Sequence, residues 1–545
     1  MVKYIYSMGC IMEQFVSKVE AELKEYKTLK TAVDQEKFVK GLALEKEDLQ
    51  IQNIILLEKL SIEKARKYAK KTEKTISPYI QISLFDNSDI FNEAETIVDK
   101  EQSAKDEYEV ITYKRKKRQN KTNLKNENIV TIEIDHRLEG DDLLCPKCNQ
   151  ELKEMGHKEV RTYNFVPAKL ELHVHKEYSY KCNYCSKDDK ALIVHSKRIT
   201  SFPKLMVEDS FVSNVIVEKY LKHVPLYRQE KVFNNMGLEV TRKNFSNWII
   251  KAAFVLKPIY VLLYKNIINS DICHMDETPL QVITNEANNT YIWGLASSKY
   301  DKEAYVYIYE RNRKYENAIK ILNGFKGYVH SDGYDAYKRV PEAINVGCFA
   351  HARRKYMEII KASDKDSDFH KLALEGKKYI DRLYSIEHLA KKNNLTPDKI
   401  FELRQKMSLP IIIEYETWLN NNPYKIYNQL AITKAINYSL NALPELKNYL
   451  KDGRLEIDNN RAERMMKSFV IGRKNFLFCF TESGAEASAL LYSIVETAYA
   501  NHLKVEQYLT YIFKTLPLIN VKNIAEVSEL LPYSDKLPQE LKIKL

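Results

Sequence analysis

The sequence predicts a multidomain α+β protein, on three observations. Its 545 residues are too many for one ordinary domain, so several units of roughly 100 to 200 residues are expected. Two Cys-x-x-Cys pairs in the first half of the chain predict a small metal-binding module. Hydrophobic residues change from helical spacing to strand-like alternation after about Ser270, which predicts a separate unit that contains a sheet.

The composition is that of a globular protein. Hydrophobic residues make up 44% of the chain and charged residues 29%, which excludes a disordered or membrane-embedded class. No apolar run reaches the roughly 18 residues of a membrane span, and the first residues lack a signal-peptide pattern, so we expect a cytoplasmic protein with no membrane partner. The net charge of +11 favours a polyanionic partner, although an ordinary basic surface explains it equally well.

Residues 1–75 are expected to form helices with coiled-coil character, because apolar residues recur at helical spacing with almost no Gly or Pro. Leu42, Leu49 and Leu56 fall seven residues apart, and Asn53 is a polar member of the same seam. Such a polar position fixes register and oligomeric state in coiled coils. A homo-oligomer is one interpretation, and a helix packed on its own chain is the other.

A flexible linker that ends in a basic arm is predicted at residues 76–128. Residues 86–109 are acidic and poor in large apolar clusters, whereas residues 114–125 carry seven basic side chains and no acidic one. Because the arm precedes the first Cys pair, it is a candidate for phosphate contact, with a solvated charged segment as the alternative. The candidate residues are Lys114, Arg115, Lys116, Lys117 and Arg118.

Residues 129–200 are predicted to form a zinc ribbon. The pairs CPKC and CNYC are separated by a strand-like alternating segment, and two such turns present four thiolates to one tetrahedral zinc ion. One structural zinc would stabilise a segment too small to bury its own core, and a redox pair is the alternative. His173 and His175 lie on the polar phase of the strand and are expected at the surface. The zinc ligands would be Cys145, Cys148, Cys182 and Cys185.

Residues 201–265 are predicted to contain a helix-turn-helix. A first helix spans about residues 227–235, a break follows at Gly237, and Thr241 is a good N-cap for a second helix. Phe245 and Trp248 would pack inward. The second helix of such a unit enters the major groove of DNA, whereas a plain helical hairpin is the alternative. The outward DNA-contact candidates are Arg242, Lys243 and Asn247.

From residue 266 to 360 the pattern predicts three successive strands, a helix, a strand, and a strand that runs into a helix, which is the element order of an RNase H-like α/β core. Asp276 is expected late in the first strand. Strand alternation places His274 and Asp276 on one face and Met275 and Glu277 on the other, so the two adjacent carboxylates are not expected to share a site. Glu277 is expected to be polar or ion-paired, where Pro279 ends regular pairing.

Three carboxylates fall at related positions in this order. Asp276 belongs to the first strand, Asp332 ends the fourth, and Glu463 lies in a later helix. Two-metal phosphoryl-transfer sites need hard oxygen ligands that hold two divalent ions about 4 Å apart. Each residue alone has an ordinary explanation: a strand exit, an Asp-Gly turn, and an N-x-x-E helix start that begins at Asn460. Their joint placement in one topology favours the metal site.

The motifs MDETPLQV, HSDGYDAY, GCFAHARRKY and DNNRAERMMKSFVIGRKNFLF resemble those of the DDE transposases of bacterial insertion sequences, and specifically the large transposase of the insertion-sequence sixty-six family. The resemblance spans almost the whole chain. It implies an RNase H-like catalytic core, built from residues 266–360 and 451–500, in which Asp276, Asp332 and Glu463 are catalytic and hold two Mg²⁺ or Mn²⁺ ions. It also implies an all-helical insertion at residues 361–450. Residues 501–545 are expected to form a small helical element.

The resemblance implies a transposase that binds the double-stranded DNA ends of its own element, cleaves and joins strands, and acts as an oligomer on DNA, with accessory proteins of the same element as possible partners. A DNA-binding regulator with an inactive core, and a metal-dependent nuclease without strand joining, are the alternatives. Further DNA contacts are expected after the fifth strand and beside Glu463, with solvated surface charges as the alternative. These candidates are His351, Arg353, Arg354, Arg464, Lys467, Arg473 and Lys474.

Overall fold

The computed structural model describes residues 170–181, 193–196, 198–285, 290–423 and 430–543. Within it, Leu172–Leu545 belong to one compact unit. The predicted helices of residues 1–75, the linker and basic arm of residues 76–128, and the four cysteines of the predicted zinc site lie outside the described residues.

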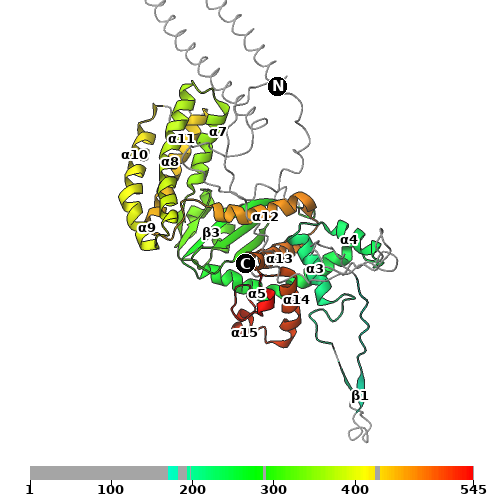
Figure 1. Ribbon diagram of the computed structural model, residues 1–545. Helices are drawn as coiled ribbons and strands as arrows, with labels where there is room; N and C mark the ends of the chain where they lie inside the picture. Colours follow the sequence, from blue (N-terminus) through cyan, green and yellow to red (C-terminus); the bar gives the residue numbers. More distant parts are fainter. Residues whose placement is uncertain (1–169, 182–192, 197, 286–289, 424–429, 544–545) are drawn as a thin grey trace, which may run out of the picture. The chain divides into compact units, whose positions relative to one another are not determined.

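A mixed sheet lies at the centre of the described fold (Figure 1). Its strands follow the order β5-β4-β3-β6-β7, in which β3, β4 and β5 are antiparallel neighbours and β6 and β7 run parallel to β3. Helix α6 (Tyr315–Ile321) lies between β5 and β6 in the sequence. This α+β fold confirms the predicted succession of three strands, a helix and two more strands. The strands are β3 (Ile272–Val282), β4 (Thr290–Ser297), β5 (Tyr305–Glu310), β6 (Tyr328–His330) and β7 (Ile344–Val346).

Strand β3 changes neighbours along its length. It pairs with β6 only as far as His274, opposite His330, whereas its pairing with β4 continues past Pro279. A short strand, β8 (Phe478–Cys479), joins at the far end of β3. Between these points β3 pairs on one side only in the described structure, and a proline, which has no N–H to donate, is tolerated there. The prediction that Pro279 ends regular pairing is therefore wrong, and Asp276 lies in the middle of the strand rather than late in it.

The outer edge of β5 is covered by side chains of a helix. The backbone N–H groups of Tyr305 and Tyr307 donate to Thr497 Oγ1 at 3.0 Å and to Ser493 Oγ at 2.8 Å, both on α13 (Glu482–Ala500). An uncovered strand edge invites pairing with another chain, so these hydroxyl groups both satisfy the edge and attach α13 to the sheet.

The predicted pair of helices after residue 225 is present. Helix α4 (Leu226–Asn235) is followed by a turn at Gly237, whose φ of +91° favours glycine. Thr241 caps the next helix as predicted, through a capping box with Asn244. Phe245 and Trp248 are buried, also as predicted, with ring centroids 5.2 Å apart.

The second of these helices, α5 (Arg242–Ile268), extends into the main apolar core. It packs against α13 and α3 (Asp209–Tyr220), and Ala252, Leu256 and Leu263 are completely buried. Within the part of the chain that the structure describes, α5 is the one helix that is long and apolar enough to cross a membrane by length and composition. Four further elements are described: β1 (Ser179–Lys181), which pairs with β2 (Ile193–His195), and helices α14 (Val505–Thr515) and α15 (Ile524–Ser528) near the end of the chain.

A second apolar core is formed by the helices that follow β7, which lie together in Figure 1. Its centre includes Tyr356 and Tyr415, whose hydroxyl groups are 3.0 Å apart. These helices agree with the helix-rich segment expected between residues 361 and 450. They are α7 (Phe349–Ala362), α8 (Asp368–Lys392), α9 (Pro397–Leu403), α10 (Leu409–Asn421) and α11 (Ala431–Lys447).

Helix α12 (Asn460–Phe476) lies across β3 and β4 (Figure 1). It comes close at Gly294 of β4, where a Cβ atom would overlap the side chains of Met465 and Met466. The hydroxyl of Tyr307 donates to the Met465 carbonyl at 2.7 Å. The absence of a side chain at Gly294 therefore sets how closely this helix approaches the sheet.

Candidate active site

Asp276 lies on the face of β3 that α12 covers. Its partner in the β3–β4 register is Gly294, and side chains directly opposite each other in antiparallel strands lie on the same face. The Asp276 side chain accepts a hydrogen bond from the Glu277 N–H at 2.9 Å. Asp276 therefore faces the helix that carries Glu463.

Asp332 lies two residues beyond His330, the last residue of β6. Since β3 and β6 are parallel and pair up to His274 and His330, Asp276 and Asp332 each stand two residues beyond the last pair. The chain turns at Gly333, whose φ is +87°, and the Asp332 carboxylate accepts the Tyr334 N–H at 2.9 Å. Both aspartates thus stand at the point where β3 and β6 separate.

Glu463 lies in the first turn of α12. Its Oε2 is 3.3 Å from Arg354 Nη2 and its Oε1 is 3.7 Å from His351 Nδ1, both on α7. The N-cap of α12 is Asn459, and the Asn460 side chain donates to Asp458 at 2.8 Å. The described contacts therefore do not include an N-x-x-E capping pair between Asn460 and Glu463.

The electrostatic field around Asp276 is strongly negative. Burial, followed by the neighbouring charges of Glu277, Asp332 and Glu463, raises the pKa of the Asp276 carboxyl to about 8. A carboxyl surrounded in this way gains most from a nearby cation, because the cation favours the ionised form.

The donor set fits a hard divalent ion. Glu463 Oε1 is buried and has no hydrogen-bond partner in the described structure, and all three candidate ligands offer carboxylate oxygens, which Mg²⁺ and Mn²⁺ prefer. The ligand atoms of Asp276, Asp332 and Glu463 are not among the described groups of three that lie within 4.8 Å of one another. Arg313, with Nη2 at 3.8 Å from Asp332, and Arg354 beside Glu463 hold the two outer carboxylates in ion pairs.

Cys348, His351 and Glu463 do form such a close group. Burial raises the pKa of the Cys348 thiol to about 12, so this sulfur is neutral at ordinary pH. Among these three side chains, the Cys348 thiol is engaged by the backbone. Its Sγ accepts the Asn459 N–H at 3.2 Å.

A family model described as "Transposase IS66 family" matches residues 204–487, which is just over half of the chain and includes all three carboxylates. The chain belongs to the IS66 transposase family. This confirms the resemblance drawn from the four motifs.

Curated relatives of this IS66-family chain include three uncharacterised proteins of Sinorhizobium fredii (strain NBRC 101917 / NGR234). The protein y4jD is 26% identical over 419 residues, which cover 74% of this chain and 80% of y4jD. The protein y4hP is 23% identical over 413 residues, or 72% of this chain and 73% of y4hP. The protein y4qI is 26% identical over 354 residues, or 60% of this chain and 62% of y4qI. No solved structure matches the chain.

Glu277 has a different environment from its neighbour. Its side chain is 1% exposed, accepts from Arg313 Nε at 2.6 Å, and also accepts from the Tyr337 hydroxyl of η4 (Asp335–Arg339). The expected ion pair is therefore confirmed. Arg313 in turn approaches Asp332, so Glu277 is connected to the carboxylate cluster through a cation that the sequence analysis did not single out. The only sequence signal was a basic residue after the third strand.

Several DNA-contact candidates of this IS66-family chain are engaged inside the protein. Arg353 Nε is 2.7 Å from Asp381, and Arg473 donates to Thr278 Oγ1 at 2.9 Å. Arg242 remains largely exposed while its Nε lies 3.3 Å from Glu230. His351 and Arg354 are half-buried and lie beside Glu463. Five further candidates are exposed at the surface: Lys243, Asn247, Arg464, Lys467 and Lys474.

His173 and His175 are exposed, as expected, but they share a partner. Each places a ring nitrogen 2.9 Å from the same oxygen of Glu208, and the three side chains form a second close group of potential metal ligands. The His-x-His spacing in the sequence could have indicated this group. Nothing in the sequence indicated its carboxylate partner, Glu208, which lies 33 residues after His175.

Proposed function

We propose that this chain binds the ends of its insertion sequence and, at Asp276, Asp332 and Glu463, catalyses metal-dependent cleavage and joining of DNA strands. The observation that carries the proposal is the convergence of these carboxylates where β3 and β6 separate, with a buried Asp276 whose charge lacks a described cation partner. The strand order supports an RNase H-like class for the sheet. The family supports DNA as the substrate.

When bound, two Mg²⁺ or Mn²⁺ ions would activate the attacking oxygen and stabilise the leaving oxygen at phosphorus. Asp276, Asp332 and Glu463 would hold these ions through their carboxylate oxygens. Arg313 and Arg354 lie beside Asp332 and Glu463, so their guanidinium groups would be available as donors to DNA phosphates at the site.

DNA would be held by several parts of the chain. The exposed start of α5 presents Arg242, Lys243 and Asn247 to the major groove as the second helix of a helix-turn-helix. Exposed Lys467 and Lys474 on α12 would contact backbone phosphates near the site. The basic arm and the four-cysteine zinc site would add contacts from outside the described residues. We propose a cytoplasmic homo-oligomer on DNA, with accessory proteins of the element as further partners.

The test is cleavage of labelled DNA that spans the ends of the element, with Mg²⁺ or Mn²⁺, by wild-type protein and Asp276→Asn. We expect the variant to bind the DNA but to lose cleavage by about 10³-fold or more, since a catalytic metal contributes several kcal/mol. Asp271→Asn is the matched control, because Asp271 precedes the same strand but is 72% exposed and pairs with Arg454.

Each outcome separates one alternative. Binding by the wild type without any metal-dependent cleavage would favour a DNA-binding regulator and contradict the proposal. Cleavage without joined products would favour a nuclease. Equal losses for Asp276→Asn and Asp271→Asn would mean that Asp276 has no special role.

A further inference from the structure

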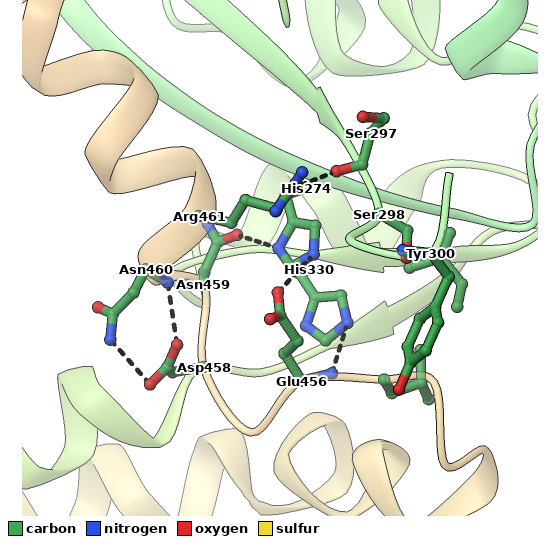
Figure 2. Close-up of polar contacts among 12 residues, drawn as sticks. His274, Ser297, Ser298, Tyr300, His330, Glu456, Asp458, Asn459, Asn460 and Arg461 are labelled. Atoms are coloured by element: carbon green, nitrogen blue, oxygen red, sulfur yellow. Dashed lines mark hydrogen bonds and ion pairs between the residues drawn. The ribbon is translucent and has the colours of Figure 1, made fainter. Parts of the chain in front are cut away.

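Two buried histidines form the last pair between β3 and β6. His274 and His330 are 1% and 0% exposed, and their rings stack with centroids 4.3 Å apart and planes 10° apart (Figure 2). Each stands two residues before a candidate metal ligand, Asp276 or Asp332. The stack therefore lies directly before the point where the two strands separate.

Hydrogen bonding fixes the protons on His274. The Asn459 amide donates from Nδ2 to the Met275 carbonyl at 2.8 Å, so its Oδ1, at 3.1 Å from His274 Nδ1, must accept. His274 Nε2 lies 3.1 Å from a Glu456 carboxylate oxygen, which also accepts. Both ring nitrogens of His274 thus face hydrogen-bond acceptors, the amide oxygen of Asn459 and the carboxylate of Glu456. Burial opposes ionisation of Glu456, but the hydrogen bond and charge of His274 bring its pKa to about 2.

His330 is the neutral member of the stack. Its Nε2 accepts the backbone N–H of Glu456 at 3.4 Å, which leaves the proton on Nδ1. Burial, together with the charge of His274, lowers the pKa of His330 well below its usual value. One segment, Glu456–Asn459, therefore binds both histidines, as Figure 2 shows.

That segment leads directly into the helix that carries Glu463. In sequence, the five helices α7–α11 separate it from β7, so chain connectivity does not hold Glu463 beside the two aspartates. Side-chain contacts do: Asn459 attaches to β3, and Arg461 donates to the Ser297 carbonyl at the end of β4 at 2.6 Å. The contact between His274 and Glu456 is a further part of this attachment.

We propose that His274, Glu456 and Asn459 are positioning residues that fix Glu463 relative to Asp276 and Asp332, so that the three carboxylates can hold metal ions together. The proposal rests on the proposed function, because it takes these carboxylates as the metal ligands. A merely structural role would lower stability and leave the metal affinity of the folded protein unchanged.

The test measures Mn²⁺ binding to the full-length protein without DNA, by calorimetry or by electron paramagnetic resonance. Glu456→Gln removes the charge at nearly constant size, and Asn459→Asp replaces the donor to Met275 with an acceptor. Groups that orient metal ligands contribute about 10- to 100-fold to affinity, so we expect Mn²⁺ to bind at least tenfold more weakly in both. Glu456→Asp, which keeps the charge, should fall between Glu456→Gln and wild type.

Cleavage provides a second measurement. The Mn²⁺ concentration for half-maximal cleavage should rise by the same factor, whereas DNA binding without metal should not change. Glu414→Gln is the matched control, because it makes the same chemical change at a glutamate that is 51% exposed on α10 and lies 2.6 Å from Arg382. No described contact joins Glu414 to the three carboxylates. The Glu414→Gln protein should bind Mn²⁺ as the wild type does.

Failure of the inference and failure of the proposed function are distinguishable. If Asp276→Asn binds Mn²⁺ as tightly as wild type, the carboxylates are not the metal site and both fail. If Asp276→Asn loses Mn²⁺ while the folded Glu456→Gln and Asn459→Asp proteins keep wild-type affinity, the positioning role alone is wrong. A variant that does not fold, as judged by circular dichroism, is replaced by Glu456→Asp, whose unchanged affinity would overturn the inference equally.

Discussion

At the scale of single residues, Glu277 and Asp276 are adjacent in sequence but have opposite environments. Glu277 contacts Arg313 and Tyr337, whereas the charges that raise the pKa of Asp276 are those of other carboxylates. Glu277→Gln should therefore lower the free energy of unfolding by about 1 to 3 kcal/mol through loss of a buried ion pair. The substitution should lower the cleavage rate by less than about tenfold, because the Glu277 side chain orients Arg313 and is not expected to hold metal.

Urea denaturation and cleavage assays on Glu277→Gln and Asp276→Asn measure the two effects side by side. Loss of cleavage by Glu277→Gln as complete as that of Asp276→Asn would place Glu277 among the metal ligands.

Glu496 on α13 gives the clearest pH dependence of stability. It is 9% exposed, and burial raises its pKa to about 7, although Ser468 donates a hydrogen bond to it at 2.5 Å. Because the folded state then binds a proton more tightly than the unfolded state, Glu496 destabilises the protein as pH rises from about 4.5 to about 7. Glu496→Gln should remove this loss, so it should be about 1 to 3 kcal/mol more stable than wild type at pH 8.5 and nearly equal at pH 4.5.

Unfolding free energies at the two pH values check this. Glu486→Gln, at an exposed position on the same helix, is the control and should show the pH dependence of the wild type. The same dependence in Glu496→Gln would show that Glu496 is not the titrating group.

Residue identity alone predicted the acidic cluster but not the groups that surround it. Asp276, Asp332 and Glu463 stood in motifs with a recognisable chemistry. Arg313 and His330 did not stand in such motifs. Arg313 pairs with Glu277, 36 residues away, and His330 accepts the N–H of Glu456, 126 residues away, so the sequence did not indicate their roles. Likewise, the sequence could not show that Arg353 pairs with Asp381 in the helical segment.

At the scale of elements, the position of α12 depends on Gly294. Gly294→Ala should displace Met465 and Met466 and with them the helix that carries Glu463. Because the obstructing atoms are ends of flexible side chains, the expected loss of stability is about 1 to 3 kcal/mol. The cleavage rate of the folded Gly294→Ala protein should also fall, because Glu463 moves with the helix.

A double-mutant cycle tests the cause. In a Met465→Ala background, Gly294→Ala should cost clearly less, because the nearest obstructing side chain is gone. Additive losses of stability would mean that the cost arises in β4 itself.

Elements were predictable where local pattern decides them. Alternating apolar residues gave the strands of the sheet, and Thr241 with its neighbours gave the start of α5. The prediction that Pro279 ends regular pairing in β3 was wrong because a proline removes only one hydrogen-bond donor. In the described structure, β3 pairs with β4 at Pro279, and its pairing with β6 has already ended at His274. The arrangement of the whole sheet decides which edge of a strand lacks a partner strand. The residues of the strand itself do not indicate this.

At the scale of the whole molecule, the order of elements was predictable from the sequence. The candidate metal site and the predicted zinc ligands come from separate stretches of the chain. All the contacts of the three carboxylates described above come from residues between His274 and Glu463, whereas the predicted zinc ligands precede residue 186. Loss of zinc should therefore leave the carboxylate site intact. Cys145→Ser should remove about one zinc ion per chain, because a structural site needs all four thiolates.

Cys145→Ser should also weaken binding to element-end DNA by at least about tenfold, the scale of losing a few phosphate contacts. Its Mn²⁺ affinity should equal that of the wild type, because no described ligand contact involves the zinc segment. Zinc content by elemental analysis, DNA affinity at fixed salt and Mn²⁺ calorimetry on the same preparation decide between the outcomes. Zinc retained in Cys145→Ser would remove the ribbon, and parallel loss of Mn²⁺ binding would mean that the zinc segment and the carboxylate site depend on one another.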